Sequence, residues 1–159
     1  MCTTIGDRQH MGNTTFVILS LDQIDQVVSL TQQLPEFTRP YPKEVYEKRL
    51  ISVPHLLLGV VHEGQLIGCK LGYDRDQDGS FYSWIGGVHP EHRRKGLAKK
   101  LADQMEAWAR EQGYRSIRFK TRNRLKAMLQ FAIGNGFSII KVDPESTLGE
   151  YRIWLEKPL

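Results

Sequence analysis

Residues 88–98 read Val88-His89-Pro90-Glu91-His92-Arg93-Arg94-Lys95-Gly96-Leu97-Ala98, and this stretch decides how the rest of the chain is interpreted. A β-rich run precedes it and an apolar stripe at helical spacing follows it, so three consecutive cations stand just before a predicted helix. The positive end of the helix dipole repels such cations, at about 0.3–1 kcal/mol each. An anion would reverse the sign, because first-turn N–H groups, a glycine and flanking cations together form a phosphate cradle. A solvated basic loop is the alternative reading.

The hydrophobic pattern on either side of this stretch predicts an α/β (α+β) fold. Alternating or continuous apolar runs predict strands, and stripes at a spacing of three to four residues predict helices. The expected strands are 14–19, 56–61, 66–71, 81–88, 117–121, 138–142 and 151–155, and the expected helices are 24–34, 42–50, 97–112 and 125–133. The order is βααβββαβαββ, a mixed and mostly antiparallel central sheet flanked by helices. The pair Gly86-Gly87 inside a strand predicts a bulge or a close backbone approach.

Length and composition predict one ordinary globular domain. The chain has 159 residues, of which 40% are hydrophobic, 25% charged and 9% aromatic, which excludes collagen-like, coiled-coil and wholly disordered chains. We expect a single domain over residues 13–159 and a disordered leader over residues 1–12, which are polar and aperiodic. No apolar run approaches a membrane span and the start lacks signal-peptide order, so a cytoplasmic protein without a membrane partner is expected.

Charge is distributed unevenly along the chain. Residues 91–126 hold 12 of the 22 Lys and Arg residues but only 4 of the 18 Asp and Glu residues, which leaves 10 basic and 14 acidic residues elsewhere. Such a distribution suits a polyanion on the basic segment and a cationic ligand on the remainder.

The basic stretch resembles a known family. Arg93-Arg94-Lys95-Gly96-Leu97-Ala98 fits the fingerprint of the GNAT superfamily of N-acetyltransferases, which is Gln or Arg, two residues, Gly, one residue, then Gly or Ala. The strand 84–88, the Val88-x-Pro90 entry, Asn123 after the next strand and the Gly136-Phe137 ending follow the family's order too. The resemblance covers residues 56–155.

This resemblance implies a binding site for acetyl-CoA. In the family the loop amides and the helix N-terminus bind the coenzyme A pyrophosphate, and pantetheine fills the gap where the preceding strand splays from its neighbour. The residues expected to hold the diphosphate are Arg93, Arg94, Lys95, Gly96, Leu97 and Ala98. Backbone groups of Gly87 and Val88 are expected to pair with pantetheine, with the Val88 N–H as the oxyanion donor. Asn123 is similar in place to a side chain that contacts pantetheine.

The implied reaction is direct transfer of acetyl from acetyl-CoA to a primary amine in a ternary complex, which needs a general base and a general acid. Here the sequence departs from the family. Where the general base of the family commonly lies, this sequence has Trp84 and Tyr82. Where the family usually has a tyrosine as general acid, it has Gln130, Phe131 and Ala132. The catalytic residues are therefore unassigned. Glu36, Tyr82 and Tyr151 are candidates for substrate or proton handling, against a packing or surface role for each.

Two other functions explain part of the same pattern. A nucleic-acid-binding domain using the basic segment 91–126 explains the charge, but not Gly96 or the paired glycines. A catalytically silent coenzyme A sensor explains the missing tyrosine and base. No metal is expected: residues 74–79 match half of an EF-hand loop, but Ile85 occupies the position of the bidentate glutamate, which favours a hairpin turn. The amine, expected to be cationic from the acidic remainder, is unidentified, and the oligomeric state is open, a homodimer included.

Overall fold

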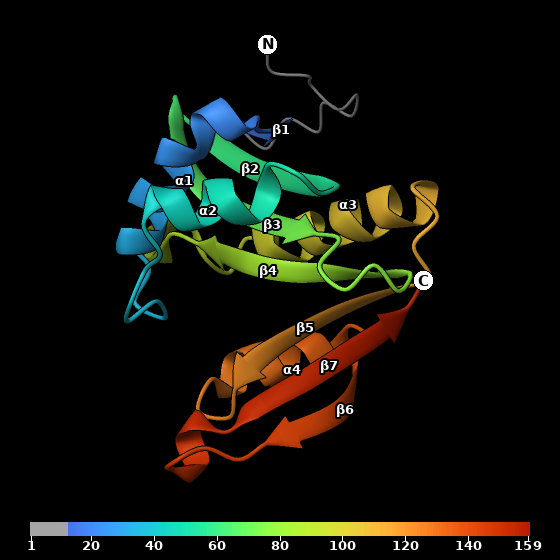
Figure 1. Cartoon of the computed structure of the whole chain (residues 1–159). Helices are drawn as coiled ribbons and strands as arrows, with labels where there is room; N and C mark the ends of the chain where they lie inside the picture. Colours follow the sequence, from blue (N-terminus) through green and yellow to red (C-terminus); the bar gives the residue numbers. More distant parts are fainter. Residues whose placement is uncertain (1–12) are drawn as a thin grey trace.

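The computed structural model describes residues 13–159, in which seven strands form one sheet with two helices on each face (Figure 1). The strands are β1 (Thr14–Ile18), β2 (His55–His62), β3 (Gln65–Tyr73), β4 (Ser80–Val88), β5 (Ser116–Arg122), β6 (Ser138–Asp143) and β7 (Arg152–Pro158). The helices are α1 (Ile24–Gln32), α2 (Lys43–Leu50), α3 (Leu97–Glu111) and α4 (Lys126–Gly134). The predicted fold class and element order are thus confirmed. The expected disordered leader, 1–12, lies outside the described residues, and the single domain over 13–159 stays a prediction.

The sheet opens in its middle. Its strand order is β1-β2-β3-β4-β5-β7-β6, and every neighbouring pair is antiparallel except β4 and β5. These two parallel strands pair only from Ser80–Tyr82 to Ser116–Arg118, although β4 continues to Val88 and β5 to Arg122. The strands therefore diverge beyond this pairing, and Figure 1 shows the resulting V between the β1–β4 and β5–β7 halves.

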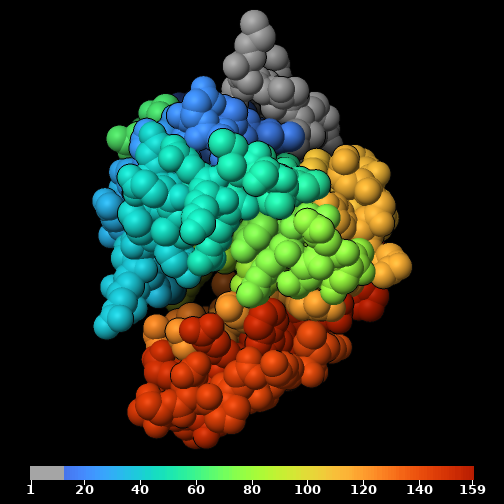
Figure 2. Space-filling view, viewed as in Figure 1, coloured from blue at the N-terminus to red at the C-terminus, as the bar shows by residue number. Residues whose placement is uncertain are grey.

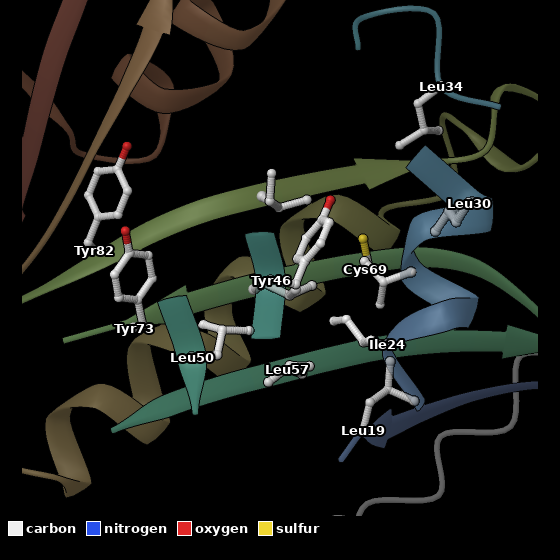
Figure 3. Packing of buried hydrophobic residues seen from close by; sticks show 13 residues of the cluster. Leu19, Ile24, Leu30, Leu34, Tyr46, Leu50, Leu57, Cys69, Tyr73 and Tyr82 are labelled. Carbon is white, nitrogen blue, oxygen red and sulfur yellow. The ribbon is translucent and has the colours of Figure 1, made fainter. Parts of the chain in front are cut away.

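Each face of the first half of the sheet has its own core. Side chains of α1 and α2 pack on Leu57, Cys69 and Leu71, the cluster drawn in Figure 3. Side chains of α3 pack on the opposite face against Leu58 and Phe81. Because successive strand residues point to opposite faces, the continuous apolar run in β2 fills both cores. The second half is thinner, since α4 covers one of its faces and no described helix covers the other.

The strand irregularity lies two to three residues before its predicted position. Leu71 pairs with Ile85 and Gly72 with Ser83, so Trp84 is the extra, bulged residue. The sequence predicted either a bulge or a close backbone approach at Gly86-Gly87. The bulge lies at Trp84 instead, and the group that comes close to Gly87 is a side chain. A Cβ atom on Gly87 would lie 2.5 Å from Cδ1 of Leu34, a residue that follows the end of α1.

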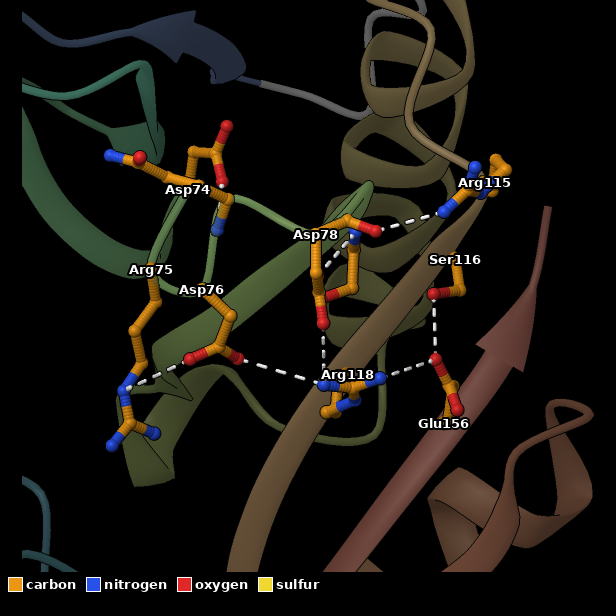
Figure 4. A network of polar contacts seen from close by, with 10 residues as sticks. Asp74, Arg75, Asp76, Asp78, Arg115, Ser116, Arg118 and Glu156 are labelled. Carbon is orange, nitrogen blue, oxygen red and sulfur yellow. Dashed lines mark hydrogen bonds and ion pairs between the residues drawn. The ribbon is translucent and has the colours of Figure 1, made fainter.

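A polar cluster joins the three segments that meet where the V closes (Figure 4). Arg118 of β5 contacts Asp78 Oδ2 at 3.2 Å and Glu156 Oε1 of β7 at 3.1 Å. Asp78 Oδ1 also accepts a hydrogen bond from the Ser80 N–H at 2.9 Å, and its carbonyl accepts one from Arg115. This cluster fixes the β3–β4 turn, which confirms the hairpin predicted for residues 74–79, to the start of β5.

The cluster predicts an acid-sensitive component of stability. Hydrogen bonds from the Ser80 hydroxyl and N–H, followed by Arg118, lower the pKa of Asp78 from 3.8 to about 2. Between pH 3.8 and about 2, Asp78 is therefore protonated in the unfolded chain but still ionised in the folded chain. The contribution of Asp78 to the free energy of unfolding falls over this range and is lost as the pH falls through about 2. We expect Asp78→Asn to lower the free energy of unfolding near neutral pH and to match the parent toward pH 2.

Urea denaturation of both proteins across this pH range measures the difference. Ser80→Ala removes the principal donor to Asp78, so it should reduce the same pH-dependent component. A deficit of Asp78→Asn that stays constant at every pH would show that the carboxylate charge is not its source.

Candidate functional site

A cleft of about 1650 Å³ occupies the opening between β4 and β5. It reaches both faces of the sheet, from the segment 36–41 before α2 on one side to the first turns of α3 and α4 on the other. Figure 2 shows the hollow on the near face, between the loop before α2 and the β5–β7 half. The cleft is large enough for an elongated ligand that enters from one face and a second ligand that meets it from the other.

The loop from β4 to α3 has the backbone of an anion cradle. Arg94 has a φ of 62° and Gly96 a φ of 75°, so both lie in the left-handed region. Gly96 is also the N-cap of α3, and a Cβ there would meet nothing within 4 Å, which leaves the backbone open to a ligand. The N–H groups of the first helical turn have no carbonyl four residues earlier to bond. The structure thus supplies the free amides and flanking cations that the sequence analysis expected.

Arg93 holds this loop to two other parts of the site. Its Nε donates to the Val88 carbonyl at 2.9 Å, and its Nη2 lies 2.6 Å from Glu36 Oε1 in the loop between α1 and α2. Glu36, a candidate for substrate or proton handling, lines the cleft, but its carboxylate is in an ion pair with Arg93. This arrangement favours a role in positioning Arg93 over a role in proton transfer.

The hydrogen-bond alternation of β4 identifies its free amides. The His89 N–H donates to Ile67 O of β3 at 2.7 Å. In an antiparallel ladder the intervening residues turn both backbone groups away from the partner strand, so Val88 and Gly86 direct theirs into the opening. Gly87 has the opposite phase and faces Cys69 of β3, its register partner. The geometry thus supports the expected role of Val88 and favours Gly86 over Gly87 for pairing with a ligand.

Seven of the nine predicted coenzyme-binding residues line the cleft. They are Gly87, Val88, Arg93, Arg94, Gly96, Leu97 and Ala98. Lys95 and Asn123 are not among the lining residues. Asn123 instead donates from Nδ2 to Leu148 O at 3.1 Å and accepts from Lys126 Nζ at 2.9 Å. Its side-chain amide therefore joins the β5–α4 turn to the segment before β7.

The two tyrosine candidates have different surroundings. Tyr82 lines the cleft, where burial raises the pKa of its phenol to about 12, so it is neutral at physiological pH and can donate but hardly accept a proton. Tyr151 packs with the α4 core and does not line the cleft. At the place of the family's usual acid, Phe131 and Ala132 both line the cleft, and neither carries an ionisable group.

Sequence reasoning missed Lys70, a lysine inside the apolar run of β3. Its Nζ lies 3.7 Å from where a Cβ on Gly86 would be, on the α3 side of the cleft. Burial lowers the pKa of its ammonium, and no ion pair joins it to a carboxylate among residues 13–159. The sequence did contain a signal for it, since Lys70 is the single cation in the apolar run 66–71.

Aromatic and cationic side chains line the opposite side of the cleft. They come from the segment before α2, from α2, from β3 and the turn that follows it, and from β4, β5 and β7: Arg39, Tyr41, Arg49, Tyr73, Arg75, Tyr82, Trp84, Lys120, Arg122 and Arg152. Within the described part of the chain, no group of three or more His, Cys, Asp or Glu residues is placed to hold a metal ion. No helix among residues 13–159 combines the length and apolar character that crossing a membrane requires.

Comparison with known proteins places these features in a family. The family model described as Acetyltransferase (GNAT) family matches residues 24–137. An acetyltransferase of Sodalis glossinidius (strain morsitans) is 30% identical over 88 residues, which are 54% of this chain and 59% of the relative. An acetyltransferase of Pectobacterium atrosepticum is 29% identical over 92 residues, 56% and 62% of the two chains. The chain thus aligns with less than two thirds of either relative.

Solved structures share the whole fold. Ard1 from Thermoplasma volcanium superposes with a TM-score of 0.78 at 18% identity, over 93% of this chain and 99% of that one. The PaiA N-acetyltransferase of Thermoplasma acidophilum, solved in complex with coenzyme A, gives a TM-score of 0.74 at 17% identity, over 93% and 100%. At these identities the likeness establishes the fold alone. Because the family match spans most of the sequence, including the β4–α3 cradle, the chain belongs to the GNAT family of acetyltransferases.

Proposed function

We propose that the protein transfers the acetyl group of acetyl-CoA to a primary amine in a ternary complex. The observation that carries the proposal is the position of the opening between β4 and β5, directly beside a cradle of free amides and cations at the start of α3. These residues fit the coenzyme, since the cradle suits a diphosphate and the opening suits a narrow, amide-bearing chain. Bound there, acetyl-CoA supplies an activated thioester.

Some groups of the chain bind the coenzyme, and another polarises the thioester carbonyl. Arg93, Arg94 and the amides after Gly96 hold the diphosphate, and the amides of Gly86 and Val88 fix the chain that follows it. The Val88 N–H donates to the carbonyl oxygen on which negative charge develops. A pre-positioned donor of this kind contributes roughly 3–4 kcal/mol to the barrier reduction.

Proton transfer uses fewer protein groups than is common. The carboxylates that line the cleft are Glu36 and Glu106, and both are in ion pairs, Glu36 with Arg93 and Glu106 with Lys157 at 2.9 Å. The proposal is therefore that the amine enters the cleft uncharged or loses its proton to water. The Tyr82 hydroxyl, which stays protonated, is the candidate donor to the leaving sulfur. The proton that the attacking nitrogen loses as the amide forms passes through water and restores the Tyr82 hydroxyl.

The proposal extends to the surroundings of the reaction. We infer one catalytic domain over residues 13–159, in the cytoplasm, with acetyl-CoA and the amine as its ligands and with neither metal nor nucleic acid taking part. The oligomeric state is left open. Curated relatives named as acetyltransferases support the reaction class, although they match this chain over only part of their length.

Release of the coenzyme A thiol in the presence of acetyl-CoA and a panel of primary amines tests the proposal. We expect stoichiometric thiol release and amine acetylation with at least one class of amine, and neither with Arg94→Glu. Calorimetric binding of acetyl-CoA without turnover of any amine would support the silent sensor. Absence of acetyl-CoA binding, with salt-sensitive binding of duplex DNA, would support the nucleic-acid-binding function instead.

A further inference from the structure

The side of the cleft away from α3 holds cations that stack on aromatic rings. The guanidinium carbon of Arg49 lies 4.8 Å from the centre of the Trp84 ring and 5.1 Å from that of Tyr41. The guanidinium carbon of Arg75 lies 4.8 Å from the centre of the Tyr82 ring. These contacts fix planar cations with their N–H edges available to a ligand.

Lys120 lies within the same cluster. Its Nζ is 5.1 Å from the centre of the Trp154 ring. Burial, and then the charges of Arg75, Arg152, Arg49 and Arg122 in that order, lower the pKa of its ammonium. These side chains therefore lie near one another, although α2, the β3–β4 turn, β5 and β7 supply them. Cations gathered in this way repel one another, and an anion among them would remove the repulsion.

The cluster is only partly neutralised from within the chain. Arg122 has Glu150 at 3.6 Å, Arg152 has Glu145 at 3.5 Å, and Arg75 has Asp76 at the limit of 4.0 Å. Among residues 13–159, no ion pair joins Arg49 or Lys120 to a carboxylate. The acidic excess outside the basic segment is used elsewhere, as in the Asp78 and Glu156 contacts with Arg118.

We propose that Arg49, Arg75 and Lys120 form a subsite for a carboxylate or similar small anionic group on the acceptor, so that the amine substrate is an amino acid or an acidic peptide. This inference rests on the proposed function and names its substrate class. It has the opposite sign from the cationic acceptor expected from the acidic remainder of the chain. Of the acidic residues in that remainder, Glu36 is the one that lines the cleft within residues 13–159, and its charge is paired with Arg93. Planar guanidinium groups on aromatic faces suit a flat carboxylate that also requires two donors.

The experiment compares amines that differ in one charge. β-Alanine, its carboxamide and diaminopropane have similar lengths and carry an anionic, neutral or cationic end. Their binding to the full chain saturated with coenzyme A is measured by calorimetry, so the result does not depend on turnover. Glycine and longer ω-amino acids vary the amine-to-carboxylate spacing, and a peptide with aspartate at its second position, against one with lysine there, separates a free acid from a peptide source.

Carboxylate-bearing amines are expected to bind about 10- to 100-fold more tightly than their amides, and the diamine most weakly. Arg49→Gln and Lys120→Gln should each remove most of this preference while leaving coenzyme A binding unchanged. Lys48→Gln, an exposed neighbour on α2 outside the cleft, is the matched control and should retain it.

The outcomes separate the two proposals. Tight binding of the diamine, or a carboxylate preference unaffected by either substitution, would overturn the anionic subsite and leave acetyl transfer standing. Failure of the parent protein to bind coenzyme A would overturn the proposed function itself.

Discussion

Replacing Gly96 by glutamate is expected to weaken acetyl-CoA binding by about 100-fold or more, which corresponds to about 2.7 kcal/mol. The new carboxylate would stand at the N-terminus of α3, where the diphosphate is proposed to bind, and would repel it while taking up the first-turn amides. The side chain has room, since nothing lies within 4 Å of the Cβ position, so the loss would come from charge and occupancy. Calorimetric titration of acetyl-CoA measures it.

Gly113→Glu is the matched control. Gly113 follows the other end of α3, has a φ of 89° against 75° for Gly96, and also has nothing within 4 Å of its Cβ position. Both substitutions therefore introduce similar backbone strain, about 1–2 kcal/mol, and the same charge. Equal loss of affinity in the two variants would mean that strain, and not the cradle, is responsible. Retained affinity in Gly96→Glu would place the diphosphate elsewhere.

Replacing Gly72 by valine is expected to destabilise the fold by about 3–4 kcal/mol. A Cβ atom on Gly72 would lie 2.4 Å from Phe81 Cε1 and 2.8 Å from the Tyr82 carbonyl oxygen. The Phe81 side chain is completely buried against α3 and the Tyr82 carbonyl is backbone, so neither can yield without moving β4. The free energy of unfolding from urea denaturation measures the effect.

Gly68→Ala, in the same strand, is the control for this change. The nearest atoms to its Cβ position are at 3.4 Å, an ordinary contact distance or close to it, so we expect an effect below about 1 kcal/mol. Similar destabilisation by both substitutions would show that the close contacts at Gly72 are not the source of the loss. A small effect of Gly72→Val would show that the bulge at Trp84 can relax.

The fold was largely predictable because local and long-range signals agree. The start of the first helical segment is an example: Ser20 and Gln23 have the spacing of a capping box, and the Ser20 N–H donates to Gln23 Oε1 at 3.0 Å. The continuous apolar run 56–61 predicted a strand, and the structure explains the run, because both faces of β2 are covered. Local sequence patterns do not specify which strands pair. The divergence of β4 from β5 was therefore expected only from the family resemblance.

The cradle was also predictable, since Arg93 to Ala98 are consecutive and their chemistry depends on one loop. The anionic subsite was not, because Arg49, Arg75 and Lys120 come from α2, the β3–β4 turn and β5 and meet only after folding. Counting charge by segment even suggested the opposite sign. The basic segment 91–126 was weighed as a nucleic-acid surface, but its residues Arg118, Arg122 and Arg124 are in ion pairs with Asp78, Glu156 and Glu150.

If acetyl-CoA binds as proposed, the short pairing of β4 with β5 makes the lifetime of the protein depend on the coenzyme. Three residues of each strand join two halves of one sheet, and beyond them the facing edges lack a partner among the described strands. An acetyl-CoA molecule bound there as proposed would complete the sheet and stabilise the folded state by about 2.7 kcal/mol at 100 times its dissociation constant. A cell short of acetyl-CoA would then expose more of this protein to proteases, so its abundance would follow the supply of the acetyl donor.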